Sequence, residues 1–454
     1  MMPSLSLIDL AHQYGGVLWQ LDGQPELGSV SIDSRKMTAG DCFVAIRGEQ
    51  FDAHDFLEDV VERGAASLVV EAPLQRKIPQ WVVKDSVQAL GQIARENRRM
   101  FDRPLVAITG SNGKTSVKEM LASILSLSGE VLATKGNLNN HIGVPLTLFE
   151  LSPQHQFAVI EMGASALGEI EYLCSVAEPD IALVNNVGEA HLEKFGSSEN
   201  IFRAKGEIYA GLKKGGTAVV NLDSRGARTY IENLEDCEYI GFSAESVEAD
   251  VYATNIVLNQ SGSVFDIWLN GEQLSVSLNV PARHNVANAL AAAACAYALG
   301  VKCETIIDGL ESFGGVEGRL QMKDGLNGSR LIDDSYNASP VSAHAAVDLL
   351  ASLDGKRIFV LGDMAELGPD AERLHAKLGE YARIRGVDAL FATGSLSRAA
   401  ADAFGVDGYW FESKSALIEG LSENLTVGVT ALVKGSRSAA MNKVIEKLNT
   451  EEGR

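Results

Sequence analysis

Nine residues at 107–115, Ala-Ile-Thr-Gly-Ser-Asn-Gly-Lys-Thr, place a glycine-bounded turn and a Lys-Thr pair between two apolar segments. The run 105–108 is typical of a buried strand, and the apolar spacing over 115–127 is typical of a helix. At the N-terminus of such a helix, unpaired backbone N–H groups and the positive end of the helix dipole face an anion. The segment therefore predicts a phosphate-binding loop, made of Thr109, Gly110, Ser111, Asn112, Gly113, Lys114, Thr115 and Ser116.

Two side chains of this loop could do chemistry on a nucleotide. The Lys114 ammonium would reach the terminal phosphates, and the Thr115 hydroxyl would bind Mg²⁺. The first glycine of the full pattern G-x-x-x-x-G-K-[ST] is replaced by Ile108. A chance Gly-Lys-Thr in an ordinary turn is the alternative, and the strand-turn-helix context favours the phosphate site.

Three further side chains are candidates at the same place. Glu161 ends the apolar run 157–160 and would supply a second Mg²⁺ ligand beside Thr115, the alternative being a surface Glu that begins a helix. His191 follows another predicted strand, and its spacing alone does not separate a ligand from a structural hydrogen bonder. Lys205, taken alone, is interpreted as a solvated charge on a helix.

Length, composition and charge limit the class of protein. A chain of 454 residues exceeds one ordinary core, so two to four domains are expected, and 46% hydrophobic with 22% charged residues is typical of a folded soluble protein. A net charge of −21 argues against nucleic acid as the main partner. Five cysteines without a C-x-x-C pair predict free thiols and argue against a zinc site. The N-terminus lacks the basic region of a signal peptide, and the stretch 287–300 is too short to span a bilayer, so a cytoplasmic location is expected.

The chain divides into three predicted blocks. Residues 1–84 form a small α/β block with a helical stretch at 53–64. Residues 85–316 alternate strands and helices as in a parallel sheet, and residues 317–454 repeat that rhythm in a second doubly wound sheet. The expected strands of the middle block are 105–108, 157–160, 181–184 and 218–220, then antiparallel 251–257, 264–269 and 274–280, before a helix at 285–299. The last block is expected to hold strands 358–361, 389–392 and 431–433, with helices near 370–384, 413–423 and 438–448. Ligands of such sheets bind beyond the carboxyl ends of the strands, where the phosphate loop, Glu161, Asn185, Asn186 and His191 all fall.

Motifs in nine regions, in one fixed order, resemble the Mur ligase family. They are 109–115, 136–147, 191–196, 204–208, 283–289, 318–319, 333–338, 362–368 and 434–438. The resemblance spans nearly the whole chain, and it accounts for the missing first glycine because the family uses the shorter form T-G-x-x-G-K-T.

The resemblance implies an α/β protein of three domains. These would be an N-terminal domain for a UDP-sugar, a central parallel-sheet ATPase domain, and a C-terminal Rossmann-like domain that closes over both. The implied activity is ATP-dependent amide-bond formation in peptidoglycan synthesis. It would join D-alanyl-D-alanine to a UDP-N-acetylmuramoyl-tripeptide through an acyl phosphate. The expected partners are these small molecules and Mg²⁺, with no nucleic acid and a monomeric chain.

The resemblance also implies roles for single residues. Lys205 would be carbamylated by CO₂ and hold a second Mg²⁺ with His191, Asn288 would contact adenine, Asp334 the ribose, and Arg319 the phosphates. The uridine nucleotide would meet Ser34, Arg35, Phe51 and His54. The sugar-peptide would meet Asn137, Asn139 and Asn140, and the dipeptide would meet Lys434, Ser436 and Arg437.

Most of these residues could instead have a structural role without binding a ligand. Asn288 could be a polar residue facing solvent in mid-helix, Arg319 and Asp334 a surface pair in a linker, and residues 434–437 a basic helix cap. Within the class, the rival is another Mur or folylpolyglutamate-type ligase. The segments 362–368 and 434–438 favour the dipeptide-adding activity, and the absence of a D-N-P-R segment argues against the addition of the third residue. From another class, the rival is a nucleotide switch or motor ATPase.

Overall fold

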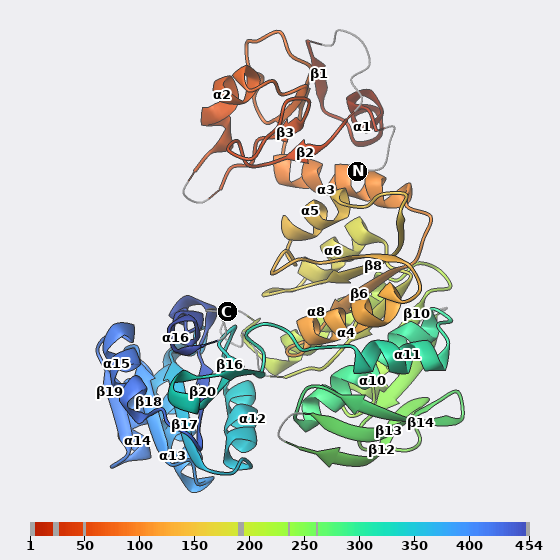
Figure 1. Ribbon diagram of the computed structural model, residues 1–454. Helices are drawn as coiled ribbons and strands as arrows, with labels where there is room; N and C mark the ends of the chain where they lie inside the picture. The colour runs from red at the N-terminus through yellow and green to blue at the C-terminus, as the bar shows by residue number, and fades with distance from the viewer. Residues whose placement is uncertain are drawn as a thin grey trace.

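The computed structural model describes residues 5–20, 27–48, 51–188, 195–234, 237–259 and 262–450. Three sheets follow one another along the chain and occupy three regions of the molecule (Figure 1). The N-terminal sheet lies at the top of this view, the central sheet at the right, and the C-terminal sheet at the lower left. The α/β class expected from the sequence is confirmed, and no helix among the described residues is long and apolar enough to cross a bilayer.

The N-terminal sheet has five short strands in the order β1-β5-β4-β3-β2, parallel except for the pairing of β1 with β5. The strands are β1 Val17–Trp19, β2 Val30–Ser31, β3 Cys42–Val44, β4 Ser67–Val70 and β5 Gln80–Val82. Helix α1 spans Leu7–Tyr14 and α2 spans Leu57–Glu62. The helical stretch expected from residue 53 begins as a 3₁₀ turn, Ala53–Phe56, because the Asp52 carboxylate caps the backbone N–H of His54.

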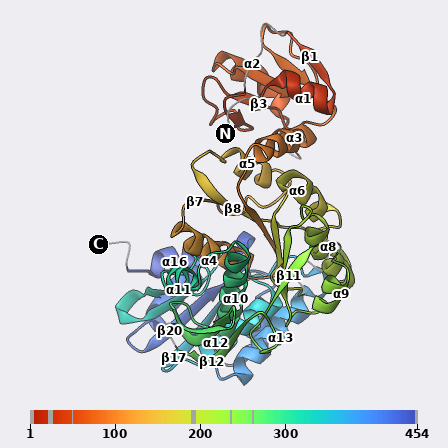
Figure 2. The same ribbon diagram turned by 90° about the vertical axis from the view of Figure 1, so that its right-hand side faces the viewer.

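Helix α3, Ser86–Arg99, joins the first sheet to the second (Figures 1 and 2). The predicted boundary at residue 84 falls just before it. Its apolar side chains Leu90 and Ile93 belong to a buried cluster that runs from the first sheet into the central one. The buried Asn97 donates to Leu148 O, and the buried Arg98 donates to Ala177 O. The helix is therefore fixed to the central region by both apolar contacts and hydrogen bonds.

The central sheet has nine strands in the order β14-β13-β12-β11-β10-β9-β6-β8-β7. The seven strands from β6 to β12 are parallel to one another. Strand β13 pairs antiparallel with β12, and β14 pairs antiparallel with β13, as the alternating pattern after residue 250 predicts. The strands are β6 Leu105–Thr109, β7 Glu130–Ala133, β8 His155–Glu161, β9 Ile181–Val184, β10 Thr217–Asn221, β11 Glu238–Ser243, β12 Val251–Leu258, β13 Ser263–Leu269 and β14 Glu272–Leu278. The helices are α4 Lys114–Ser126, α5 Gly143–Phe149, α6 Glu169–Ala177, α8 Ser198–Ala210, α9 Ala227–Glu232, α10 Arg283–Ala298 and α11 Cys303–Glu311.

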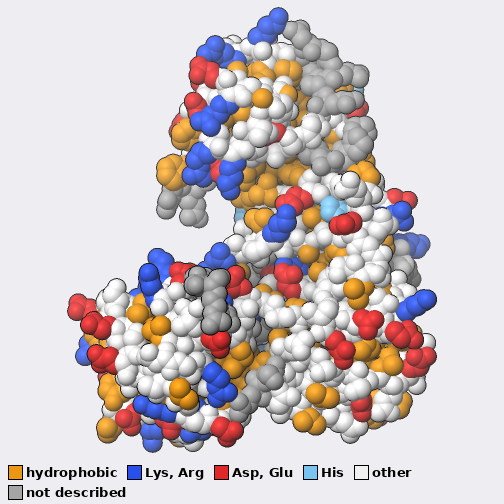
Figure 3. Space-filling model, in the orientation of Figure 1, with side chains coloured by type: hydrophobic (Ala, Val, Ile, Leu, Met, Phe, Trp, Pro, Cys, Tyr) orange, Lys and Arg blue, Asp and Glu red, His pale blue; other side chains and the backbone are white. Residues whose placement is uncertain are grey.

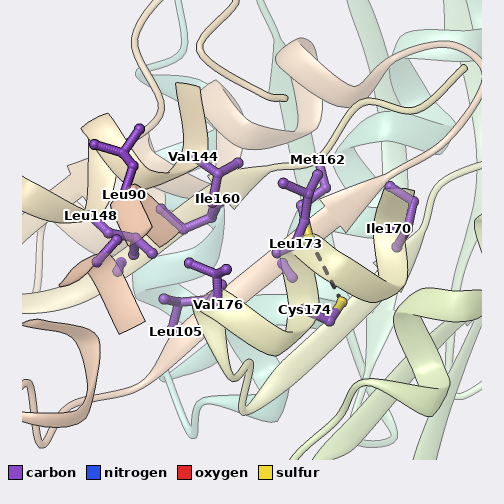
Figure 4. Close-up of a cluster of buried hydrophobic side chains, with 14 of the residues drawn as sticks. Leu90, Leu105, Val144, Leu148, Ile160, Met162, Ile170, Leu173, Cys174 and Val176 are labelled. Atoms are coloured by element: carbon purple, nitrogen blue, oxygen red, sulfur yellow. Dashed lines mark hydrogen bonds between the residues drawn. The ribbon is translucent and has the colours of Figure 1, made fainter. Parts of the chain in front are cut away.

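Both faces of the central parallel sheet are buried, so its middle strands are apolar without alternation. In β6, Leu105 and Ala107 face one cluster, and Val106 and Ile108 face the other. The first cluster includes α5 and α6, whose side chains meet those of β8 (Figure 4). The second cluster includes α4 and α10. This double cover holds the carboxyl ends of the strands in fixed positions.

The C-terminal sheet has six strands in the order β15-β16-β20-β17-β18-β19, parallel except for β15. The strands are β15 Gln321–Asp324, β16 Arg330–Asp334, β17 Lys356–Gly362, β18 Ala389–Thr393, β19 Gly408–Phe411 and β20 Val429–Lys434. The helices are α12 Pro340–Ala351, α13 Ala371–Ile384, α14 Arg398–Phe404, α15 Lys414–Asn424 and α16 Asn442–Leu448. The last helix starts later than the predicted residue 438, because Ala440 is left-handed, with φ 49°, and separates a 3₁₀ turn from α16.

Candidate active site

A cavity of about 1470 Å³ lies where the central and C-terminal regions meet, and the start of α3 completes its wall. The face between the N-terminal region and the C-terminal region is hollowed (Figure 3). Most of the predicted site residues line this cavity, although they are far apart in the sequence. They are Ser111, Asn112, Gly113, Lys114, Ser116, Asn137, Asn139, Asn140, Glu161, Lys205, Asn288, Arg319, Asp334, Lys434, Ser436 and Arg437.

The predicted phosphate loop connects β6 to α4, and its glycines are required there. Gly113 has φ 77°, and a Cβ at this position would lie 2.4 Å from Asn288 Oδ1 and 2.5 Å from Asn185 Nδ2. Lys114 begins the helix and donates from Nζ to Gly110 O at 2.7 Å. The ammonium is therefore held over the loop, where a phosphate group would lie.

The segment that follows β9, residues 185–188, forms hydrogen bonds to the phosphate loop and holds it in place. Ser111 Oγ donates to Gly188 O at 2.9 Å, and the Asn112 backbone N–H donates to Asn186 Oδ1 at 2.9 Å. Asn185 donates from Nδ2 to Asn112 O at 3.0 Å. The position of Asn185 and Asn186 directly after a buried strand is the sequence signal that indicates a role for both amides in the site.

Two oxygen groups meet at the carboxyl ends of β6 and β8. Thr115 Oγ1 donates to Glu161 Oε2 at 2.8 Å, and Asn139 Nδ2 donates to Glu161 Oε1 at 2.7 Å. Thr115 is 7% exposed and Glu161 3%, so the alternative of a surface Glu is wrong. Among the described residues, no three His, Cys, Asp or Glu side chains converge on a metal position. A divalent ion here would therefore depend on a hydroxyl, one carboxylate and oxygens of its ligand.

Arg319 reaches this oxygen pair from the chain segment before β15. Its Nη2 donates to Thr115 Oγ1 at 3.0 Å, and its guanidinium carbon lies 4.4 Å from the centroid of the Tyr336 ring. Within the described part of the chain, its buried Nε finds no hydrogen-bond acceptor. A surface pair of Arg319 with Asp334 does not form, so this alternative is wrong.

Three cations, Lys114, Lys205 and Arg319, lie near Glu161, and the carboxylates of Glu169 and Glu207 also act on Lys205. Burial lowers the pKa of Lys114, and the Arg319 cation lowers it further. Burial and the Lys114 cation lower the pKa of Lys205 to about 7. Lys205 is 2% exposed, so its interpretation as a solvated helix charge is wrong. An anionic ligand would relieve the repulsion among these cations.

Asn288 lies under the phosphate loop and not on the solvent face of α10. It is 4% exposed, its Oδ1 accepts from Asn185 Nδ2 at 3.0 Å, and its Nδ2 donates to Asn285 Oδ1 at 3.2 Å. The alternative of a solvent-facing residue is wrong. In this arrangement the Asn288 amide supports the loop as well as lining the cavity.

The parallel pairing of β16 with β20 brings Asp334 opposite Lys434. Lys434 Nζ donates to Asp334 Oδ2 at 2.5 Å and to Asn337 O at 2.9 Å. Burial raises the pKa of Asp334, although the Lys434 cation acts in the opposite direction. Lys434 ends a buried strand, so the helix-cap alternative is wrong for it, and two of its three N–H groups are already engaged.

Arg437 and Ser436 follow β20. Arg437 Nη1 donates to the Tyr336 hydroxyl at 3.2 Å, and the Ser436 backbone N–H donates to Asp363 O at 2.9 Å. Tyr336 thus touches two cations of the cavity wall, a role that no spacing in the sequence predicts.

Three asparagines follow β7, and the first of them, Asn137, lines the cavity. Asn140 Oδ1 accepts from the backbone N–H of Gly143 at 2.8 Å, so this side chain shapes the start of α5. Asn139 alone contacts Glu161.

The four N-terminal candidates Ser34, Arg35, Phe51 and His54 do not line the cavity. The exposed Arg35 forms two 2.9 Å hydrogen bonds to Asp33, and Phe51 is 73% exposed. His54 Nδ1 lies 2.6 Å from Asp52 Oδ1, and its Nε2 accepts from Glu71 N at 3.0 Å. Both ring nitrogens of His54 are therefore engaged within the N-terminal region. His191 lies outside the described residues.

Models of three protein families match the chain. The Mur ligase family, catalytic domain, matches residues 26–101, the Mur ligase middle domain matches 108–296, and the Mur ligase glutamate ligase domain matches 318–437. The UDP-N-acetylmuramoyl-tripeptide–D-alanyl-D-alanine ligase of Escherichia coli is 43% identical over 98% of this chain and 99% of its own length. A crystal structure of MurF from Acinetobacter baumannii superposes with a TM-score of 0.91 at 36% identity, covering 98% of each chain. MurF of Thermotoga maritima, in complex with ADP, gives a TM-score of 0.84 at 29% identity, covering 92% of this chain and 96% of that one.

Proposed function

The chain belongs to the Mur ligase family, and on that premise we propose that it joins D-alanyl-D-alanine to a UDP-N-acetylmuramoyl-tripeptide at the expense of ATP. The relatives that support this activity match the chain over nearly its full length. The observation that carries the proposal is the meeting of Thr115, Glu161 and Arg319, because it joins a phosphate loop to a second cation from the C-terminal side. The three predicted blocks, divided near residues 84 and 316, are proposed as the domains for UDP-sugar, ATP and closure.

The cavity fits a nucleoside triphosphate with Mg²⁺. The buried Nε of Arg319 has no acceptor among the described residues, and the Lys114 ammonium lies at the loop. Both groups suit phosphate oxygens. The Thr115 hydroxyl and the Glu161 carboxylate are hard oxygen ligands of the kind that Mg²⁺ prefers. Mg²⁺ bound there would neutralise negative charge on the phosphates.

The residues of the chain would act by positioning and by balancing charge. The terminal carboxylate of the tripeptide attacks the γ-phosphorus of ATP, so an acyl phosphate forms and ADP leaves. The dipeptide amine then attacks the acyl carbon, the C–N bond forms, the C–O bond to phosphate breaks, and the amine loses a proton. Lys114 and Arg319 would stabilise the charge that develops on the transferred phosphoryl group. No nucleophile of the chain is needed.

Lys205 is proposed to carry a carbamate. The neutral amine is the form that reacts with CO₂, and burial with the Lys114 cation lowers the Lys205 pKa to about 7. The product is a carboxylate, which offers oxygen ligands where an ammonium would repel a metal ion. His191 is proposed to share this second Mg²⁺. For Asn288 and Asp334 the adenine and ribose roles remain proposals, as do those of Ser34, Arg35, Phe51, His54, Asn137, Asn139 and Asn140 toward the UDP-sugar-peptide and of Lys434, Ser436 and Arg437 toward the dipeptide.

The proposed enzyme works as a cytoplasmic monomer on small molecules, without nucleic acid. A phosphate-release assay tests the function. The assay uses ATP, Mg²⁺ and UDP-N-acetylmuramoyl-tripeptide with either lysine or diaminopimelate as third residue, with and without D-alanyl-D-alanine. Sustained phosphate release only with both small substrates supports the ligase. Release stimulated by a macromolecule, without need for either substrate, would support the rival nucleotide switch instead.

A further inference from the structure

The Tyr336 side chain contacts two arginines that belong to different parts of the cavity wall. The Arg319 guanidinium carbon lies 4.4 Å from the ring centroid, and that of Arg437 lies 5.4 Å from it. The hydroxyl accepts a hydrogen bond from Arg437 Nη1 at 3.2 Å. The ring therefore contacts both cations, more closely that of Arg319, and the hydroxyl engages Arg437 alone.

Arg319 needs this support because little else orients it. Its Nη2 donates to Thr115 Oγ1 at 3.0 Å, while its buried Nε has no acceptor among the described residues. A guanidinium over an aromatic face is attracted by the negative charge of the π-system, and more strongly where water is excluded. The ring thus restricts the guanidinium to the side of Thr115.

Tyr336 is itself held in place by the backbone. Its N–H donates to Gly318 O at 3.1 Å. Gly318 has φ 71°, and a Cβ there would lie 3.1 Å from the Cβ of Tyr336. Tyr336 comes two residues after the end of β16, whose last residue, Asp334, accepts a hydrogen bond from the buried Lys434. The ring is therefore placed by the sheet as well as by its neighbours.

We propose that Tyr336 is a positioning residue that holds Arg319 at the phosphate loop through its ring, and Arg437 through its hydroxyl in addition to the ring. The inference rests on the proposed function, in which Arg319 serves phosphoryl transfer and Arg437 serves the dipeptide. Two parts of one side chain then support the two halves of the reaction. Separate substitutions can therefore separate the halves.

The test uses Tyr336→Phe and Tyr336→Leu in the full chain. The first half-reaction is measured as ADP formed in a single turnover with ATP and UDP-N-acetylmuramoyl-tripeptide but no dipeptide. The second is measured as the KM for D-alanyl-D-alanine in steady-state ligation. Thermal unfolding of each variant shows whether it is folded.

Tyr336→Phe keeps the ring, so we expect an unchanged first half-reaction and a KM for the dipeptide raised several-fold. Tyr336→Leu removes the ring, so we expect the first half-reaction to slow by about tenfold, equivalent to about 1.4 kcal/mol, in addition to the raised KM. Equal behaviour of the two variants in both measurements would overturn the inference. So would a slowed first half-reaction in Tyr336→Phe.

Tyr381→Phe is the matched control. It removes a tyrosine hydroxyl that donates to Asp348 in the same region of the chain, at a place that does not line the cavity. Both measurements should remain at their wild-type values in this variant. If the wild-type chain forms no product, the proposed function fails. If the wild type ligates and the Tyr336 variants behave alike, only the positioning role fails.

Discussion

Arg319 and Thr115 are 204 positions apart, yet Arg319 Nη2 donates to Thr115 Oγ1 at 3.0 Å. The same hydroxyl donates to Glu161 Oε2 at 2.8 Å. Through this relationship a cation from the C-terminal side, the hydroxyl of the phosphate loop and a carboxylate at the end of β8 form one group. The proposed phosphoryl transfer depends on that group.

Lys114→Ala should abolish ligation and leave the fold intact. The residue begins α4 beside the cavity, and its cation is proposed to balance the terminal phosphates. Loss of such a group from a transition state costs about 3 kcal/mol or more. Ligation rate and thermal unfolding would be measured together. Lys213→Ala, at a lysine that pairs with Asp180 away from the cavity, should change the rate by no more than about twofold. Near-normal ligation by a folded Lys114→Ala chain would rule out the phosphate-loop assignment.

Glu161→Gln should raise the concentration of Mg²⁺ needed for half-maximal activity by roughly tenfold or more. The substitution preserves the shape of the side chain but removes the negative charge beside Thr115. The measurement is activity against Mg²⁺ concentration at fixed ATP. Glu150→Gln is the control, since Glu150 pairs with Lys135 outside the cavity. An identical Mg²⁺ requirement in wild type and Glu161→Gln would show that Glu161 is not a ligand.

The phosphate loop, Glu161 and the parallel strands β6, β8, β9 and β10 could be predicted because each is an apolar run or lies at the end of one. Strands β7 and β11 were not among the expected strands, because both are partly exposed and lack a long apolar run. The pairing of Lys434 with Asp334 could not be predicted, because it requires β20 to lie beside β16. The order of strands in a sheet cannot be determined from the local spacing of apolar residues. The contacts of Tyr336 could not be predicted for the same reason, since an aromatic residue in the loop between β16 and α12 has no periodic signal. The burial of Lys205 and Asn288 likewise depends on how the helices cover the sheet. Local patterns alone therefore do not exclude that the two side chains face solvent.

Lys205→Ala should be nearly inactive and partly rescued by a short carboxylic acid such as acetate, which would replace the lost carbamate oxygens. The Lys205 side chain is 2% exposed and its pKa is lowered to about 7. The neutral amine fraction therefore rises as pH increases through 7, and at constant dissolved CO₂ the wild-type activity should rise with it. Lys114→Ala is the control, because a carboxylate cannot replace a cation. Rescue of both variants, or of neither, would argue against carbamylation.

Binding of substrates should draw the N-terminal region toward the cavity. Arg319 already contacts Thr115, whereas Ser34, Arg35, Phe51 and His54 lie outside the cavity wall. If these residues hold the uridine nucleotide, the N-terminal region must approach the phosphate loop. Solution scattering should show a smaller radius of gyration with an ATP analogue and the UDP-tripeptide together. An unchanged radius at saturation would mean that the N-terminal assignments are wrong.

Mass spectrometry of the reaction products tests the central claim most directly. With ATP, Mg²⁺, UDP-N-acetylmuramoyl-tripeptide and D-alanyl-D-alanine, the account predicts a UDP-N-acetylmuramoyl-pentapeptide, formed in equal amounts with ADP and phosphate. Omission of any one substrate should remove the product. Consumption of ATP by the folded chain with all substrates present, but without any pentapeptide, would contradict the account.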